Sequence, residues 1–235
     1  MLMKFSPERI LYEDNHLIAV NKTCHDLVQS DKTGDEPLIE QIKSYIKERD
    51  KKPGNVFLEV IHRIDRPVSG VVLFAKSSKM LPRMNKLFHD GNVKKIYWAV
   101  VKNSPPKDSD SLVHYLLRNS QQNKSYVYDK PKPESKEARL NYKLVGKTST
   151  YFLLEIELIT GRHHQIRSQL AKIGCPIKGD LKYGFPRSNP DGGIHLHSRL
   201  VQFDHPVTGT STEIVANPPE DVLWNEFMQL TKGSN

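Results

Sequence analysis

The chain has 235 residues, 37% of them hydrophobic, which is enough for one substantial core or for two closely packed halves around a cleft. Its 35 Lys and Arg against 27 Asp and Glu give a formal charge of +8, which favours a polyanionic partner without naming one. No window approaches 18 apolar residues and residues 1–12 do not resemble a signal peptide, so the sequence predicts neither a membrane span nor secretion. The two cysteines, Cys24 and Cys175, form neither a disulfide framework nor a zinc pattern, which indicates a reducing, cytoplasmic setting.

The apolar spacing predicts strands and helices that do not alternate strictly. Short apolar runs bounded by turn residues predict strands, and helical spacing, as in Leu38, Ile42 and Ile46 after Pro37, predicts helices. In chain order we predict strands at 10–12 and 17–20, a helix from Pro37 to a polar linker at 47–54, strands at 56–61 and 71–75, a helix at 80–90, strands at 93–101 and 151–159, a helix at 162–173, a strand at 191–201 and a closing helix at 219–230. The polar stretch 103–143 is predicted to form long loops or a protruding hairpin. Together these elements indicate a single α+β domain over residues 1–235.

The first segment with candidate chemistry lies just beyond the predicted strand at 56–61. Four ionisable side chains, His62, Arg63, Asp65 and Arg66, cluster there, in a loop marked by a nearby Pro and Gly. Loops held by rigid strands often carry catalytic groups. Taken alone, the segment also fits an exposed turn with ordinary Arg–Asp pairs.

The second segment is the predicted strand at 93–101. Alternation at period two turns its even-numbered apolar residues toward the core and places Lys95, Tyr97 and Ala99 on the other face. The small Ala99 is expected to leave space beside the Tyr97 ring for a planar base. Tyrosine is also common in strands for purely structural reasons.

The third segment, 160–170, combines a predicted helix start with several cations. An apolar stripe is expected to be buried, while His164 and Arg167 lie on a neighbouring stripe. Gly161 permits a tight turn into the helix, whose first N–H groups are suited to a phosphate. A solvated basic helix face is the alternative. The histidines do not form a metal motif, because the His-Glu-x-x-His pattern is missing and His195 and His197 lack nearby carboxylates.

These segments, with two others, resemble in order the motifs of the RluA family of pseudouridine synthases. Residues 62–70 are similar to H-R-L-D-x-x-T-S-G, and 160–167 to G-R-x-H-Q-I-R. Residues 95–99 resemble the tyrosine motif of the family, 176–184 resemble P-I-x-G-D-x-x-Y-G, and 196–209 resemble L-H-x-x-x-L…H-P-x-T-G. The similarity runs from about Ile10 to Pro218. It implies a mixed, largely antiparallel sheet in two abutting halves with a central catalytic cleft. Because the first strand starts at Ile10, the accessory N-terminal RNA-binding domain of many relatives is expected to be absent.

The resemblance also implies roles for individual residues. Asp65 would be the catalytic carboxylate, Arg167 would form an ion pair with it, and Tyr97 would stack on the uracil and assist removal of the C5 proton. Arg63 would fill the space vacated by a flipped base. The remaining residues predicted to bind RNA are Arg66, Arg162 and His164.

The reaction implied is the isomerisation of a uridine in ribosomal or transfer RNA, which requires no cofactor and no metal. We expect a monomer that acts in the cytoplasm on an RNA stem-loop. Two alternatives stay open at this point: a non-catalytic RNA-binding or ribosome-assembly factor, and a metal-dependent nuclease that uses the histidines.

Overall fold

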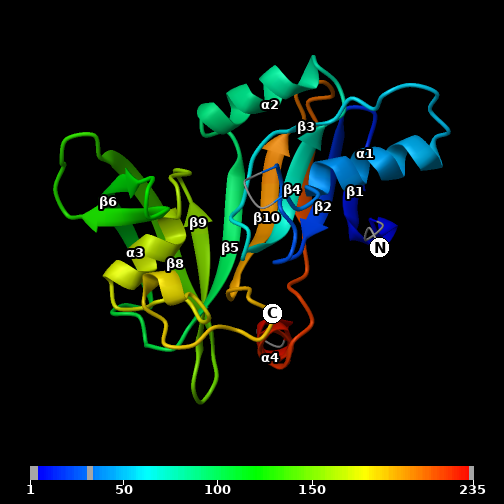
Figure 1. The fold of residues 1–235 in the computed structure, drawn as a ribbon. Coiled ribbons are helices and arrows are strands. Elements are labelled where there is room, and N and C mark those ends of the chain that lie inside the picture. The colour runs from blue at the N-terminus through cyan, green and yellow to red at the C-terminus, as the bar shows by residue number, and fades with distance from the viewer. Residues whose placement is uncertain (1–4, 31–33, 233–235) are drawn as a thin grey trace.

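A computed structural model describes residues 5–30 and 34–232 and contains one 11-stranded sheet (Figure 1). Its elements are η1 Pro7–Arg9, β1 Ile10–Glu13, β2 Leu17–Lys22, α1 Leu38–Arg49, β3 Glu59–Val60, β4 Ser69–Ala75, α2 Met80–His89, β5 Lys94–Val101, β6 Ser109–Asn119, β7 Lys124–Tyr128, β8 Lys136–Lys147, β9 Phe152–Leu158, α3 Gln165–Lys172, η2 Leu181–Tyr183, β10 Leu196–Asp204, β11 Ser211–Val215 and α4 Val222–Lys232. The strand order is β1-β2-β4-β10-β5-β9-β8-β6-β7, with β3 beside β4 and β11 beside β10. Every pair of strands is antiparallel except β4 with β10. The predicted α+β class with a mixed, largely antiparallel sheet is confirmed.

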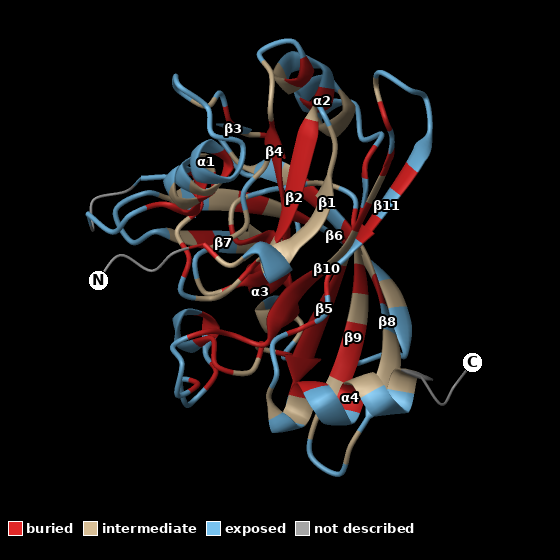
Figure 2. Ribbon diagram, turned by 90° about the vertical axis from the view of Figure 1, so that its right-hand side faces the viewer, coloured by how far each residue is buried: buried red, intermediate tan, exposed pale blue. Residues whose placement is uncertain are grey.

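Strand β5 divides the sheet into two parts, which we call the β4 half (β1–β4, β10 and β11) and the β8 half (β6–β9). In the β4 half, alternate side chains of β4 pack against two different helices. Val72 and Phe74 pack in the cluster of α1, whereas Val71 and Leu73 pack in the cluster of α2. Because both faces are covered, all seven residues of β4 are buried, as Figure 2 shows. This rigid strand begins immediately after the loop that carries Asp65.

Strand β5 is also buried on both faces, which corrects the prediction of one core face and one open face. Trp98 and Val100 pack with α4, and Tyr97 and Ala99 pack in the cluster that contains α3. Ala99 is fully buried and is not among the residues that line the cleft, whereas Tyr97 is. The period-two pattern located the two faces correctly, but it could not show that helices distant in sequence cover both.

The polar stretch 103–143 proved largely to be strand, in β6, β7 and the first part of β8. The β6–β7 pair is the protruding hairpin that was one of the two expectations, and the long loops are wrong. Along β6, Leu112, His114 and Leu116 are buried while the residues between them are exposed or half-buried. The buried face includes the polar His114 and the exposed face includes the apolar Val113, so the apolar alternation of this strand is weak in the sequence.

Other predicted boundaries shifted. The strand expected at 56–61 is only Glu59–Val60, and the strand expected at 191–201 is Leu196–Asp204. Helix α3 starts at Gln165 instead of 162, because His164 adopts a left-handed conformation with φ of 52°. The predicted elements at 80–90, 93–101, 151–159 and 219–230 correspond to α2, β5, β9 and α4. Within the described part of the chain, no helix has the length and apolar character needed to cross a bilayer.

Candidate active site

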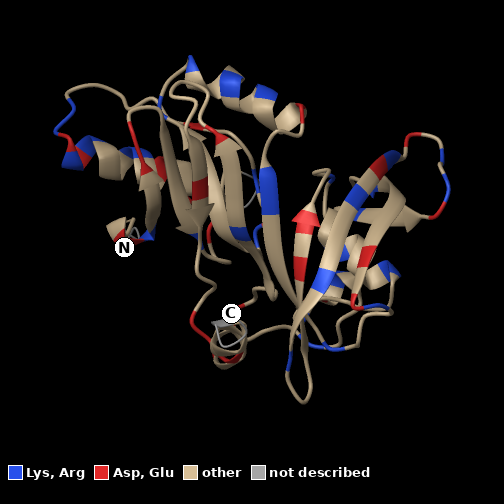
Figure 3. Cartoon of the chain, turned by 180° about the vertical axis from the view of Figure 1, so that it is seen from behind, with Lys and Arg blue, Asp and Glu red and all other residues tan. Residues whose placement is uncertain are grey.

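A cleft of about 890 Å³ lies between the two halves of the sheet, and β5 contributes to its wall. The loop that carries Asp65 and the end of α2 line it from the β4 half, while residues 158–164 and Arg167 line it from the β8 half. Among the described lining residues, Asp65 is the only carboxylate. The Lys and Arg side chains around it are Arg63, Arg66, Lys95, Arg118, Arg162, Arg167 and Lys182. Over the rest of the molecule Lys and Arg are interspersed with acidic residues (Figure 3), so the cleft is a distinctly basic environment with one anionic centre.

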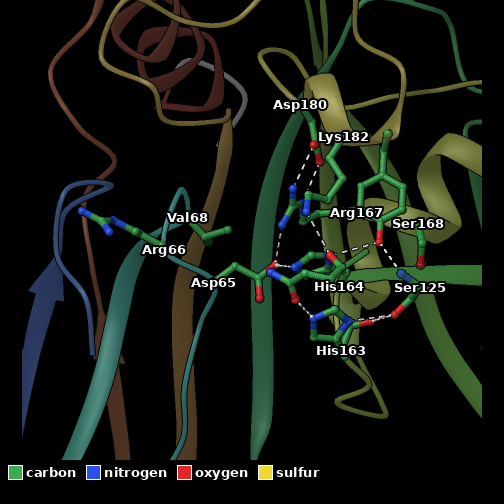
Figure 4. A network of polar contacts seen from close by, with 12 residues as sticks. Asp65, Arg66, Val68, Ser125, His163, His164, Arg167, Ser168, Asp180 and Lys182 are labelled. Carbon is green, nitrogen blue, oxygen red and sulfur yellow. Dashed lines mark hydrogen bonds and ion pairs between the residues drawn. The ribbon is translucent and has the colours of Figure 1, made fainter. Parts of the chain in front are cut away.

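Asp65 and Arg167 meet across the cleft, as the sequence predicted (Figure 4). The loop between β3 and β4 holds Asp65, and α3 holds Arg167, whose Nη1 lies 2.9 Å from Asp65 Oδ2. The Arg167 side chain is 5% exposed, against 28% for Asp65. The carboxylate is therefore anchored on one side by a buried cation and remains accessible from the cleft.

A second carboxylate, Asp180, fixes the orientation of Arg167. Asp180 is 1% exposed and accepts the Nε and Nη2 hydrogens of Arg167 at 2.7 and 2.9 Å. Burial alone would lower the pKa of Arg167, but the hydrogen bonds and charges of Asp180 and Asp65 outweigh it, and its pKa is raised. This bidentate pair leaves Nη1 of the guanidinium for Asp65.

His164 is buried beside Asp65, with Nε2 3.5 Å from Oδ2. The Tyr183 hydroxyl accepts the backbone N–H of Ser125 at 2.8 Å, so its own hydrogen is available for Nδ1 of His164 at 3.0 Å. The ring proton then lies on Nε2, directed at Asp65. Burial lowers the pKa of His164 to about 3, so the ring is neutral at physiological pH. His164 thus belongs to the immediate surroundings of Asp65 and lines the cleft, and its contact with RNA stays a prediction.

The other predicted residues lie at different depths. Tyr97 lines the cleft but is only 7% exposed, and burial raises its pKa to about 12, so it keeps its proton at neutral pH. Arg63 and Arg162 are exposed in the cleft wall, with single contacts to Gln29 Oε1 and to the Glu137 carbonyl. Arg66 points away from Asp65 and pairs with Asp35 at 2.6 Å (Figure 4).

Comparison with known proteins identifies the family and the fold. The sequence profile of the RNA pseudouridylate synthase family matches residues 16–172. The chain belongs to this family. Proteins named ribosomal large subunit pseudouridine synthase C are 33% identical in Buchnera aphidicola (strain APS), over 94% of this chain and 69% of the relative, and 32% identical in Vibrio parahaemolyticus, over 96% and 70%. A further one from Buchnera aphidicola (strain Bp) is 32% identical over 84% of this chain and 62% of the relative, so the chain spans roughly two thirds of the length of these relatives. The predicted family and its enzyme class, an isomerase, are confirmed at the level of the family.

Solved structures support the same fold. The human RNA pseudouridylate synthase domain containing 4 superposes with a TM-score of 0.77 at 21% identity, covering 96% of this chain and 93% of that chain. The human RNA pseudouridylate synthase domain containing 1 superposes with a TM-score of 0.72 at 19% identity, covering 96% and 90%. The pseudouridine synthase fold expected from the sequence is thus confirmed.

In this member of the family, a buried lysine that we did not predict holds the loop of Asp65. Lys22 ends β2, is 1% exposed, and donates through Nζ to the carbonyl oxygens of Arg66 and Val68 at 2.8 and 2.7 Å. The Thr23 carbonyl at 2.8 Å and that of Asp65 at 3.3 Å complete its surroundings. Burial lowers the pKa of Lys22 to about 8. Lys22 is therefore a positioning residue, because it fixes the backbone from which Asp65 projects.

We expect Lys22→Met to lower turnover at least about tenfold, since even one hydrogen bond to a charged group is worth ~1.5–3 kcal/mol.

In the wild type, turnover should fall as pH rises through about 8, when the ammonium loses a proton. Between pH 8 and the ordinary lysine value of 10.5, the unfolded chain binds this proton more tightly than the folded chain does, so Lys22 makes the protein more stable as pH rises. Rate measurements and chemical denaturation of the wild type and of Lys22→Met between pH 8 and 10.5 would test the expected fall in turnover and rise in stability. A pH profile of Lys22→Met that keeps the same step near pH 8 would assign the step to another group.

The remaining residues missed by sequence reasoning are Asp180, Tyr183 and Ser125. Asp180 and Tyr183 lie in the segment 176–184 that resembled a family motif, so the signal was present, but their partners were not readable from spacing. Ser125 contributes a backbone N–H from β7, which no side-chain pattern could reveal. Among residues 5–30 and 34–232, no group of three or more His, Cys, Asp or Glu side chains is arranged to hold a metal ion.

Proposed function

We propose that this chain is an RNA pseudouridine synthase that isomerises a uridine of ribosomal or transfer RNA, with Asp65 as its catalytic carboxylate. The observation that carries the proposal is the isolation of Asp65. It is the one carboxylate among the described residues of a basic cleft, and Arg167 anchors it from the opposite half of the sheet. A carboxylate in this position stabilises positive charge in a substrate that is itself a polyanion.

The chemistry requires such a group. Breaking the N1–C1′ bond of uridine builds positive charge at C1′, and the uracil then turns and rejoins through C5. The C5 proton is lost and N1 gains a proton, so the reaction is an isomerisation without net oxidation. Asp65 serves it by attack at C1′ or by removal of a ribose proton, and both steps place a carboxylate oxygen beside the ribose. Tyr97, protonated at neutral pH, meets the base as a phenol at the floor of the cleft.

The positive charge of the cleft walls is suited to RNA, as is the carboxylate at the centre of the cleft. Arg66 and Arg167 already pair with carboxylates, and the other Lys and Arg side chains of the lining supply contacts for phosphates on either side of a target nucleotide. The relatives are named for the large ribosomal subunit, which makes its RNA the first substrate to test and transfer RNA the second. One chain supplies both walls of the cleft, so we expect a monomer to suffice, and we expect it to act in the cytoplasm.

Pseudouridine mapping of total RNA from cells with and without this protein tests the proposal. We expect at least one position, in ribosomal or transfer RNA, to lose its modification when the protein is absent and to regain it when purified protein is added. RNA binding without pseudouridine formation would instead support the non-catalytic RNA-binding alternative. Cleavage of the RNA would support the nuclease.

Arg63 offers a test of how the uridine reaches Asp65. It lies two residues from Asp65 and is exposed at the cleft wall, where its single contact with Gln29 Oε1 spans 3.4 Å. Removing a stacked base costs a few kcal/mol, and a guanidinium can stack in the gap and bond the orphaned partner.

We expect Arg63→Ala to slow the reaction about tenfold or more on a structured stem-loop, with a much smaller loss on an RNA whose target uridine is already unstacked. Single-turnover rates on the two RNAs would show the difference. Equal losses on both would mean that Arg63 binds phosphate and does not fill the gap. Arg66→Ala is the matched control, because Arg66 pairs with Asp35 and points away from Asp65.

A further inference from the structure

Strand β5 brings a second functional group into the cleft besides Tyr97. Lys95 lies two residues before Tyr97 on the same face of the strand, so their Cα atoms are about 6.5–7 Å apart along it. Both residues line the cleft. Lys95 is thus fixed by the rigid centre of the sheet, beside the ring on which we expect the uracil to lie.

Most of the Lys95 side chain is buried, but its ammonium faces the cleft without a partner in the described part of the chain. Lys95 is only 9% exposed, yet among the described residues none accepts a hydrogen bond from its Nζ and no carboxylate lies within ion-pair distance. Lys22, which is 1% exposed, has by contrast four carbonyl oxygens around its Nζ. Even partial removal of an unpaired charge from water costs free energy, as the lowered pKa of Lys95 reflects, and natural proteins tolerate such a cost chiefly at functional sites.

The surroundings of Lys95 are suited to an anion. His62, which also lines the cleft, stacks on Phe88 and accepts the Leu73 N–H through Nε2 at 3.2 Å. Its ring proton therefore lies on Nδ1, and burial together with the Lys95 charge keeps the ring neutral by lowering its pKa to about 3. The nearby wall thus supplies a cation and a neutral ring that carries an N–H. Asp65, the single carboxylate of the lining residues described, is already held by Arg167.

We propose that the Lys95 ammonium binds a phosphodiester group of the RNA, next to the nucleotide whose base contacts Tyr97. This assignment rests on the proposed function for the identity of that nucleotide, but the predicted anion contact itself does not require catalysis. A phosphate would provide the counter-charge that the folded protein lacks at this position. It would also fix the ribose of the target nucleotide relative to Asp65, because β5 and the Asp65 loop line the same cleft.

Lys95→Met and Lys94→Met form a matched pair for testing this contact. Both remove one positive charge from β5, but Lys94 is exposed and lies on the opposite face of the strand. With a short oligouridylate as probe, we expect Lys95→Met to weaken binding about tenfold and to reduce the slope of log K against log salt by about 0.7. We expect Lys94→Met to leave both quantities close to wild type. Equal effects of the two substitutions would reduce Lys95 to a part of the general basic surface and overturn the proposal.

Thermal unfolding separates this role from a structural one. If Lys95 is retained for a ligand, Lys95→Met removes a partly desolvated charge that has no partner among the residues described, and its melting temperature should equal or exceed that of the wild type. A clear fall in melting temperature would mean that the ammonium supports the fold, and the assignment would fail whatever the binding result.

A substrate with a single uncharged methylphosphonate beside the mapped uridine locates the contact. At one position the wild type should lose about tenfold in affinity, while Lys95→Met should lose almost nothing more there. If the loss caused by the methylphosphonate and the loss caused by Lys95→Met added at every position, Lys95 would contact none of these phosphates. If the wild type formed no pseudouridine while the salt slope still fell only in Lys95→Met, the proposed reaction would be wrong and the anion site would stand.

Discussion

Asp65→Asn is expected to retain less than about 1% of wild-type turnover while it binds RNA with nearly unchanged affinity. The substitution preserves the shape of the side chain but removes the charge that a developing cation at C1′ requires, and losing one positioned catalytic group costs at least about 100-fold. Arg167 remains paired with Asp180, so the fold should be unaffected. The measurement is the rate of pseudouridine formation in a single turnover, with RNA affinity and the melting temperature recorded on the same samples.

Asp129→Asn is the matched control for Asp65→Asn. Asp129 also pairs with a cation, Lys172 at 3.0 Å, but it is exposed and lies outside the cleft. We expect this variant to turn over like the wild type. Substantial activity in Asp65→Asn would refute the assignment of the catalytic carboxylate, and with it the reason for placing the reaction in this cleft.

The fold was predictable wherever apolar periodicity was strong, and it was missed where one face of a strand meets solvent. β5, β9 and α2 were located within a residue or two because their buried residues recur at a clear period. β6 has the same alternation, but His114 is one of its buried residues and Val113 one of its exposed ones, so the stretch was interpreted partly as loop. The pairing of β4 with β10, distant in sequence and the only parallel pair among the described strands, is set by tertiary packing and leaves no local signal.

The candidate site, like the fold, was predictable only in part. The sequence identified Asp65, Tyr97 and Arg167 because they stand in motifs, and the structure brings all three to one cleft. It could not show that Arg167 has two carboxylate partners, since spacing does not say which acids meet across a fold. Lys22 looked like an ordinary lysine at a strand end, and only burial against four carbonyl groups reveals its role.

Arg167→Met is expected to lower turnover about 100-fold, because Asp65 loses the partner that positions it and small misplacements of a catalytic group cost that much. The salt dependence of RNA binding should stay unchanged, since the guanidinium is already occupied by Asp65 and Asp180 and not by a phosphate. The free energy of unfolding should also fall by about 3–5 kcal/mol, because Asp180, 1% exposed, is left as an unpaired buried charge.

The double variant Arg167→Met with Asp180→Asn separates catalysis from folding. Replacing the buried carboxylate by a neutral amide removes the charge that Arg167→Met leaves unpaired, so most of the lost stability should return. Turnover should remain about 100-fold down, because the contact with Asp65 is still missing. Recovery of activity together with stability would show that Arg167 matters only for the fold. The slope of log K against log salt would fall in Arg167→Met if Arg167 contacted RNA, as it does when a surface lysine is removed. Such a fall would contradict the ion pair across the cleft as the main role of Arg167.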